Sequence, residues 1–219
     1  MIRRVKMKLS EQTIGILKNF STINQNILVK SGSELQTMST MKNILGTANV
    51  SEAFPRDFGI YDLNEFLGVL SLVSDAEIEF SDSYLVVNGG KTKVRYFYSD
   101  PSILTTPPET FNPPGCDVTF NIAKIVLANV LKASAVMQLP DVVCSSGNIM
   151  ATDLKNVTSN NFTEQLDDTV GDPFELRFKV DNLKMIPGDY SVYASTSAGV
   201  SNWVGKEAAY WIATEAQTE

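Results

Sequence analysis

The side chains best able to do chemistry in this chain are lysines and carboxylates, because the usual catalytic types are missing or isolated. The 219 residues include no histidine, which removes the commonest general base and metal ligand. Two separate cysteines, Cys116 and Cys144, cannot form a structural zinc site. The sequence has no glycine-rich phosphate loop, since Asn88-Gly89-Gly90 is typical of a hairpin turn. We therefore expect a protein that is not an enzyme and that needs no metal or other cofactor.

The charge is acidic overall and is unevenly divided. The net charge is −7 and the sequence pI is about 4.7. Residues 1–108 hold 11 basic and 11 acidic side chains, whereas residues 109–219 hold 7 basic and 14 acidic ones. Such a balance is typical of a soluble protein and argues against tight binding of duplex DNA through a basic groove.

Localisation follows from the cysteines and the apolar runs. Cys116 and Cys144 both lie in apolar, strand-like segments, so we expect buried free thiols in a reducing compartment. The basic start, Met1–Lys6, leads into no apolar signal region, and no run approaches a membrane span. We expect a cytosolic protein without a membrane association.

Four helical patterns interrupt a β-rich sequence. Ser10 is a good N-cap for the first helix, Glu11–Phe20, and Asp62 with Glu65 resembles a capping box for the second. The third pattern opens at Asn121 and covers Ile122–Ser134, and the fourth is short, from Asp181 to about Ile186, where Pro187-Gly188 stops it. The strand-like runs are Glu77–Phe80, Tyr84–Val87, Lys93–Tyr98, Phe174–Val180, Tyr190–Ala194 and Ala208–Ala213.

The two halves of the chain repeat one plan. A helical pattern, an apolar run and a Ser-Gly turn follow in the same order around Ser31-Gly32 and around Ser146-Gly147. The segment Ser99–Pro114 contains five prolines and is typical of a linker. We therefore predict an α+β chain of two similar domains, residues 1–108 and residues 109–219, each built from paired strand-helix-strand repeats.

Several stretches resemble the trimeric DNA clamps of the large contractile-tail bacteriophages. They are Met7-Lys8-Leu9-Ser10, Ile16-Leu17-Lys18-Asn19-Phe20, Tyr61-Asp62-Leu63-Asn64-Glu65-Phe66-Leu67, Leu70-Ser71-Leu72-Val73-Ser74-Asp75 and Met185-Ile186-Pro187-Gly188-Asp189-Tyr190. The resemblance covers nearly the whole chain in order, is strongest over residues 7–75 and is weaker over residues 76–173. Met1–Lys6 departs from the family pattern, either as an alternative start or as an extension of the first strand.

This resemblance implies a fold, an assembly and a set of partners. In the DNA-clamp fold, antiparallel sheets form the outside of a ring and helices line its hole, and three subunits join head to tail. The implied function is a sliding clamp that encircles duplex DNA and tethers the replicative DNA polymerase for processive synthesis. The other implied partners are an ATP-driven clamp loader and RNA polymerase-associated late transcription factors, in the cytoplasm of the infected bacterial host.

On this resemblance, exposed helix faces should meet the DNA through weak contacts. Lys124, Ala128 and Lys132 recur every four residues on one face of the third pattern. The residues that we expect to face DNA are Lys18, Lys124, Lys132, Lys184, Asn64, Asn129 and Asn182. Ser71 would add polar surface, Glu11 would oppose DNA, and the alternative for each lysine is that it only solvates an exposed helix.

Two further surfaces are expected from the resemblance. Ring closure would use exposed strand edges, with Tyr84–Val87 in the first domain and Val192–Ala194 or a neighbour in the second as hypotheses. A partner peptide would bind an apolar pocket near the linker, formed by Ile103, Leu104, Pro107, Tyr210 and Ile212, although ordinary core packing is the competing interpretation of each.

Two other function classes stay open. A β-rich virion or tail assembly protein would share the repeats and the acidity, but it would lack lysine-lined helices and would copurify with particles. A hydrolase or transferase would require turnover that a single carboxylate substitution abolishes.

Overall fold

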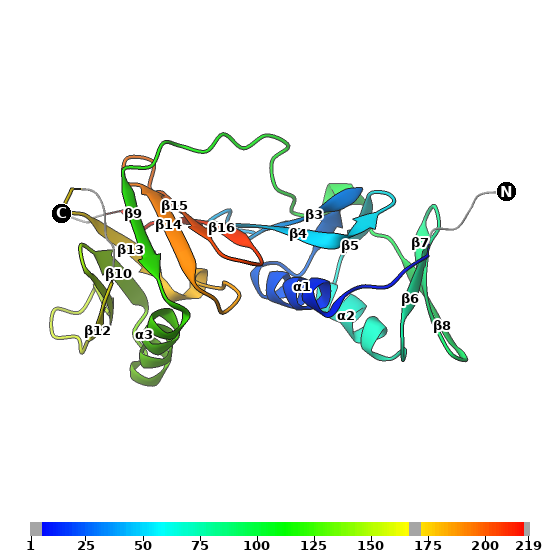
Figure 1. Ribbon diagram of the computed structural model, residues 1–219, viewed down its shortest axis with the longest axis horizontal. Helices are drawn as coiled ribbons and strands as arrows, with labels where there is room; N and C mark the ends of the chain where they lie inside the picture. Colours follow the sequence, from blue (N-terminus) through cyan, green and yellow to red (C-terminus); the bar gives the residue numbers. More distant parts are fainter. Residues whose placement is uncertain (1–5, 167–171, 217–219) are drawn as a thin grey trace. The chain divides into compact units, whose positions relative to one another are not determined.

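The computed structural model describes residues 6–166 and 172–216 (Figure 1). The leader Met1–Lys6 therefore lies outside the described residues, except for Lys6. The chain divides into two compact units, Met1–Pro108 and Glu109–Glu219. No helix in the described ranges is long and apolar enough to cross a membrane.

Both units follow the same order of elements, and within the described residues each contributes eight strands. The first unit contains β1 (Lys6–Met7), α1 (Glu11–Ile23), β2 (Ile27–Val29), β3 (Gly32–Met38), β4 (Ile44–Phe54), β5 (Phe58–Ile60), α2 (Leu63–Ser71), β6 (Glu77–Phe80), β7 (Tyr84–Gly89), β8 (Thr92–Phe97) and the 3-10 turn η1 (Pro101–Ile103). The second contains β9 (Val118–Ile122), α3 (Lys124–Met137), β10 (Asp141–Ser145), β11 (Asn148–Thr152), β12 (Phe162–Gln165), β13 (Glu175–Lys179), the 3-10 turn η2 (Val180–Asn182), β14 (Tyr190–Ser195), β15 (Val200–Val204) and β16 (Ala209–Ala213).

The strand orders repeat as well. In the first unit β1-β6-β7-β8 form an antiparallel sheet, and in the second β9, β14, β15 and β16 lie in the corresponding order. The second unit also has a sheet ordered β12-β11-β10-β13, which corresponds to the antiparallel pairs β3–β4 and β2–β5 of the first unit. The repeated plan predicted from the sequence is therefore present in the topology, and the α+β class is confirmed.

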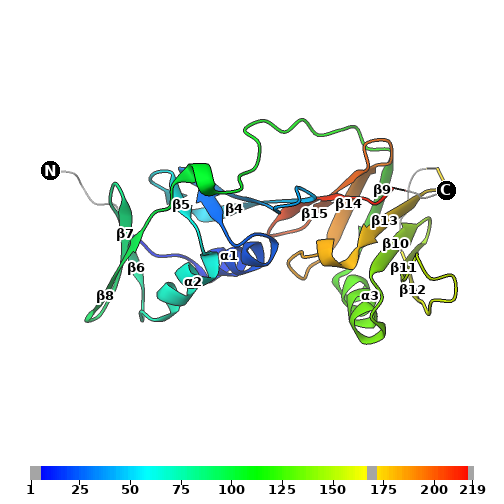
Figure 2. The same cartoon turned by 180° about the vertical axis from the view of Figure 1, so that it is seen from behind.

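The first two predicted helices are confirmed with their caps. The Ser10 hydroxyl accepts the Thr13 amide at 3.2 Å, and the Asp62 carboxylate accepts the Asn64 and Glu65 amides at 2.9 and 3.0 Å. α1 continues to Ile23, three residues beyond the predicted end. Figures 1 and 2 show α1 and α2 side by side, and α1 packs against β3 and β4.

The other two helix predictions need correction. Asn121 and Ile122 belong to β9, where Asn121 pairs with Ser191, so α3 begins only at Lys124. The predicted fourth helix is only the three-residue turn η2. Beyond it, buried Leu183 and Met185 alternate with exposed Lys184, as in an extended chain, and a proline follows closely.

Each unit has its own core. In the first, Phe20, Leu63 and Leu85 are fully buried. In the second, Trp203 is fully buried and its ring centroid lies 5.6 Å from that of Phe178. Phe20 of α1 and Leu63 of α2 thereby anchor two of the helices that carry candidate functional residues.

The cysteines and the hairpin turn were partly predicted. Both cysteines are free, but only Cys144 is buried, and burial raises the pKa of its thiol. Cys116 is exposed, against the prediction, because it precedes β9 at the end of the proline-rich segment. The turn at Gly89-Gly90 joins β7 to β8 as expected, with Gly90 at a φ of +54°.

Candidate functional site

The exposed face of α1 carries small and polar residues. Ile16, Leu17 and Phe20 are buried against the unit, while the opposite face exposes Glu11, Gly15, Lys18 and Thr22. Glu11 stands in the first helical turn, where a carboxylate favourably meets the positive end of the helix dipole. Lys18 is thus accessible to an anionic partner, and Glu11 partly offsets its charge.

A carboxylate on β4 accepts hydrogen bonds from the first residues at the start of α1. Glu52 is 9% exposed and accepts hydrogen bonds from the Ser10 amide and, at 2.6 Å, from the Thr13 hydroxyl. Burial raises the pKa of Glu52, but these hydrogen bonds outweigh it and hold the pKa below its ordinary value of 4.5. The face of α1 is therefore positioned by a charged group on the strand beneath it.

The exposed face of α2 contains little charge. Asn64, Gly68 and Ser71 are exposed, and for Asn64 and Ser71 this agrees with the polar surface expected from the sequence. The Ser71 hydroxyl donates to the Gly68 carbonyl at 2.7 Å, so this side chain is turned along its own helix. Glu65 is the exposed charge among the residues of α2, and the surface offers phosphates no cation.

The exposed face of α3 contains the predicted lysine pair. Lys124, Ala128 and Lys132 are exposed, while Leu127 and Val130 are buried. Eight residues of helix separate the lysines by roughly 12 Å along the axis. Exposed apolar side chains accompany them, since Ile125 is 65% and Val136 is 75% exposed. This face is cationic without acidic neighbours on the same helix.

The remaining predicted DNA-facing residues are placed differently. Asn129 is half-buried and donates to Glu164 of β12 at 2.8 Å, so its amide is engaged with the sheet. Asn182 is 8% exposed within η2, which leaves its side chain without access to a large partner. Lys184 is exposed, but on the extended segment after η2 rather than on a helix.

The strand edges differ from the hypothesis drawn from the sequence. Tyr84–Val87 lies in β7, between β6 and β8, and Val192–Ala194 lies in β14, between β15 and β9. Both segments have hydrogen-bonded neighbours on each side, so neither can accept another strand. Among the described strands, one end of the β1-β6-β7-β8 sheet is β8 and one end of the β12-β11-β10-β13 sheet is β12.

Sequence reasoning missed β12 altogether. The four residues Phe162–Gln165 are too short and too polar to produce a strong strand signal. β8 was predicted as a strand, and its basic alternation, with Lys93 and Arg95 flanking Val94, could have marked it as an edge.

The predicted peptide pocket is only partly accessible. Ile103 is 60% exposed and Pro107 is half-buried, but Leu104 is buried beside Gly59. Tyr210 and Ile212 are both fully buried, and the Tyr210 hydroxyl accepts the Ile186 amide at 3.2 Å. These two side chains therefore belong to the core of the second unit, and the interpretation as pocket walls is wrong for them.

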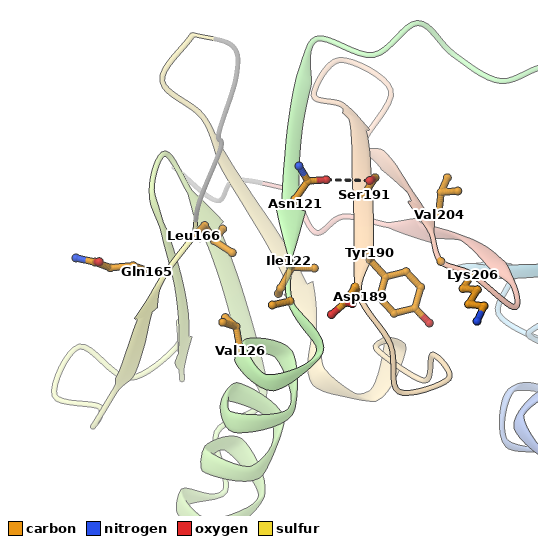
Figure 3. A pocket seen from close by; sticks show the side chains of 12 residues that line it. Asn121, Ile122, Val126, Gln165, Leu166, Asp189, Tyr190, Ser191, Val204 and Lys206 are labelled. Carbon is orange, nitrogen blue, oxygen red and sulfur yellow. Dashed lines mark hydrogen bonds between the residues drawn. The ribbon is translucent and has the colours of Figure 1, made fainter.

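The second unit has a cavity of about 380 Å³ near the start of α3. Its walls come from β9, α3, β14 and the ends of β12 and β15 (Figure 3). The lining residues are Asn121, Ile122, Ala123, Val126, Gln165, Leu166, Asp189, Tyr190, Ser191, Val204, Gly205 and Lys206. None of the five predicted pocket residues is among them.

One wall of this cavity holds α3 in place. Ala123, at the N-cap position of α3, supplies no side-chain cap. The Asp189 carboxylate accepts the Lys124 amide at 2.7 Å instead. Nearby, the Ser191 hydroxyl donates to Asn121 at 2.8 Å (Figure 3). The cavity is thus bounded by groups that already hydrogen-bond one another.

Known proteins resemble this chain over nearly its full length. The profile of the DNA polymerase processivity factor family matches residues 8–104, and that of the gp45 sliding clamp C-terminal domain matches residues 119–216. The sliding clamp of Vibrio phage KVP40 is 33% identical over 96% of this chain and 100% of its own. The sliding clamp of Enterobacteria phage T4 is 32% identical over 97% of this chain and 98% of its own.

Solved structures show the same fold at low sequence identity. The A. fulgidus PCNA solved with the C-terminal region of FEN-1 has a TM-score of 0.74 and 15% identity, over 99% of both chains. The PCNA2-PCNA3 complex from Sulfolobus tokodaii has a TM-score of 0.68 and 12% identity, over 97% of this chain and 99% of that one. Together with the sequence relatives, they place the chain: it belongs to the sliding-clamp family of DNA polymerase processivity factors.

Proposed function

We propose that three copies of this chain close into a ring that encircles duplex DNA and tethers the replicative DNA polymerase. The observation that carries the proposal is the doubled plan of the chain, in which, among the described residues, one sheet of each unit ends at a strand with one unpaired edge, β8 in the first and β12 in the second. The main-chain N–H and C=O groups of an exposed strand edge can hydrogen-bond to another strand. Head-to-tail pairing of copies leaves no such edge unpaired only when the ring closes. Each unit then acts as one clamp domain.

The charges support retention by encirclement rather than by tight binding. Three copies would carry about −21, so duplex DNA is repelled overall. Lys124 and Lys132 of α3, with Lys18 of α1, are exposed cations that can meet phosphates through water. Lys184 can add to them from its extended segment, and Asn64 can add uncharged polar surface. Weak contacts of this kind allow the ring to slide.

The further partners rest on the family alone. The sequence relatives are sliding clamps of phages, so we propose that this clamp acts in the cytoplasm of an infected bacterium. We also propose loading by an ATP-driven clamp loader and a role in late transcription. Exposed Ile103 and half-buried Pro107 stay in the proposed peptide-binding surface, since both are accessible beside the linker.

Light scattering and a polymerase assay test the proposal together. The protein at micromolar concentration should have the mass of three chains, and it should increase the product length of its polymerase on a primed circle in the presence of the loader. On a linear template with free ends the same protein should slide off and lose most of that effect. A strict monomer that never stimulates synthesis, or a chain that copurifies with virions instead, would contradict the ring.

A further inference from the structure

The outer edges of β8 and β12 are the two surfaces through which a strand of another copy could add to a sheet. β8 is six residues long and pairs only with β7, and β12 is four residues long and pairs only with β11, within the described chain. The opposite ends of these two sheets are less suited to a long partner. Within the described residues β1 covers only Lys6–Met7, and β13 already meets Glu215 through a bridge at Arg177.

The charges on these edges oppose pairing of like with like. Two antiparallel copies of β8 would place Lys93 and Arg95 opposite the same cations, and two copies of β12 would bring Glu164 toward itself. Like charges directly opposite in a sheet are destabilising. β8 against β12 avoids both of these like-charge contacts, so the occupant of each edge is the other edge of a second copy.

The side chains of β8 are sorted between two faces. Val94 and Tyr96 pair with the fully buried Val87 and Leu85, and the Tyr96 ring lies 5.4 Å from that of Phe66 in α2. The helix side of β8 is therefore apolar. The other side is exposed and carries Lys93, Arg95 and Phe97, with the Arg95 guanidinium 4.7 Å from the centroid of the Tyr84 ring.

β12 is sorted in the same way. Phe162 and Glu164 pair with the fully buried Ala151 and Ile149, and Glu164 accepts the amide of Asn129 from α3. These two half-buried side chains thus lie on the helix side. Thr163 and Gln165 lie on the other side and are exposed.

From these faces we infer the register of the joint between copies, an inference that rests on the proposed ring. β12 runs antiparallel to β8 of the next copy with Phe162 opposite Tyr96 and Thr163 opposite Arg95. Glu164 then meets Val94, Gln165 meets Lys93, and all four residues of β12 are paired. The helix side gains an aromatic pair, and the exposed side sets neutral polar groups against the two cations.

Neighbouring registers are worse for separate reasons. A slip of one residue would turn Phe162 toward the exposed side of the joined sheet and would set Arg95 against the apolar side. A slip of two residues keeps the faces, but it sets either Phe162 opposite Tyr98 or Gln165 opposite Lys91, each beyond the end of β8, so only three residues of β12 stay paired. The registers separated by two residues are therefore the alternatives that an experiment must distinguish.

Disulfide formation between pairs of introduced cysteines can test this register. The chain would carry Cys116→Ser, because Cys116 is exposed, while fully buried Cys144 stays. One variant combines Arg95→Cys with Thr163→Cys, and two matched variants combine Thr163→Cys with Lys93→Cys or with Phe97→Cys. Directly opposite residues lie about 5 Å apart, within disulfide range, whereas a two-residue offset gives roughly 8 Å, outside it. Single-cysteine variants serve as controls, and light scattering of each reduced protein reports the assembly.

We expect mild oxidation to link Arg95→Cys with Thr163→Cys into covalent dimers and trimers at least about tenfold faster than either matched variant. Faster linkage of a matched variant, in a protein that is still trimeric, would overturn the register but not the ring. A trimer that none of the three pairs links would show that other strands form the joint. Linkage of a single-cysteine variant would favour pairing of identical edges. If the unmodified chain and all the reduced variants are monomers by light scattering, the proposed ring itself is wrong.

Discussion

The two units share one order of strands but differ in the element after the fifth strand. In the first unit this position holds α2, a helix of nine residues, and in the second it holds η2, a turn of three. The first unit has no net charge and the second carries −7, yet the exposed lysine pair is on α3 of the acidic unit. The total charge of a unit and the charge on one of its helix faces are thus set independently, and the acidic unit carries the lysine pair that we propose meets phosphates.

The cores offer the largest test of this comparison. Trp203 is fully buried among Phe120, Phe178 and Tyr190, and this cluster supports the unit that has one α-helix within its described residues. Trp203→Ala should reduce the free energy of unfolding by about 3–5 kcal/mol, measured by urea denaturation with circular dichroism. Half-buried Trp211 provides a matched control, and an equal loss for Trp211→Ala would mean that the cluster is not special.

Charge reversal tests which unit meets DNA. Lys124→Glu with Lys132→Glu should reduce polymerase stimulation about tenfold at moderate salt, because the change sets anions against phosphates, while the trimer mass stays unchanged. Lys18→Glu should cost less, since Glu11 already offsets that charge on α1. If Lys18→Glu is as damaging as the pair, the contrast between the units is wrong.

The carboxylate beneath α1 predicts an acid-sensitive anchor in the first unit. Because the pKa of Glu52 is lowered on folding, its contribution is present above about pH 4.5 and is lost as the pH falls through the folded pKa. Glu52→Gln should cost about 1–2 kcal/mol at pH 7. The difference in unfolding free energy from the unmodified chain should shrink below about pH 4.5, as urea titrations from pH 7 to pH 3 would show. A difference that does not change with pH would assign the loss to packing.

The smallest expected effect concerns Gly15, a helical glycine of the first unit. Gly15 is exposed in α1 and has open space where a methyl group would be. Gly15→Ala should therefore stabilise the protein by about 0.5–1 kcal/mol in thermal denaturation. Gly89→Ala is the opposite control, because its methyl group would lie 2.3 Å from the Ser74 carbonyl oxygen. Destabilisation by Gly15→Ala would show that this face needs the glycine for another contact.

Local signals predicted most of the helical faces and few of the strand neighbours. Ser10 and Asp62 act on amides two or three residues away, so their caps can be inferred from spacing alone. Whether a strand lies at the edge of a sheet depends on which strands lie beside it. For that reason the sequence led us to expect the edges at segments of β7 and β14 rather than at β8 and β12. The burial of Asn182 and Tyr210 likewise depends on packing by distant residues, which helical or alternating patterns do not encode.

The cap that Asp189 supplies to α3 also bears on the order in which the chain folds. The start of α1 is capped by Ser10, three residues before Thr13. The start of α3 is capped by Asp189, which comes 65 positions after Lys124. A nascent chain can thus stabilise the start of α1 as soon as that segment emerges. The cap of α3 can form only after Asp189, the residue before β14, has been synthesised. The start of α3 should therefore gain its cap later during translation than the start of α1 does.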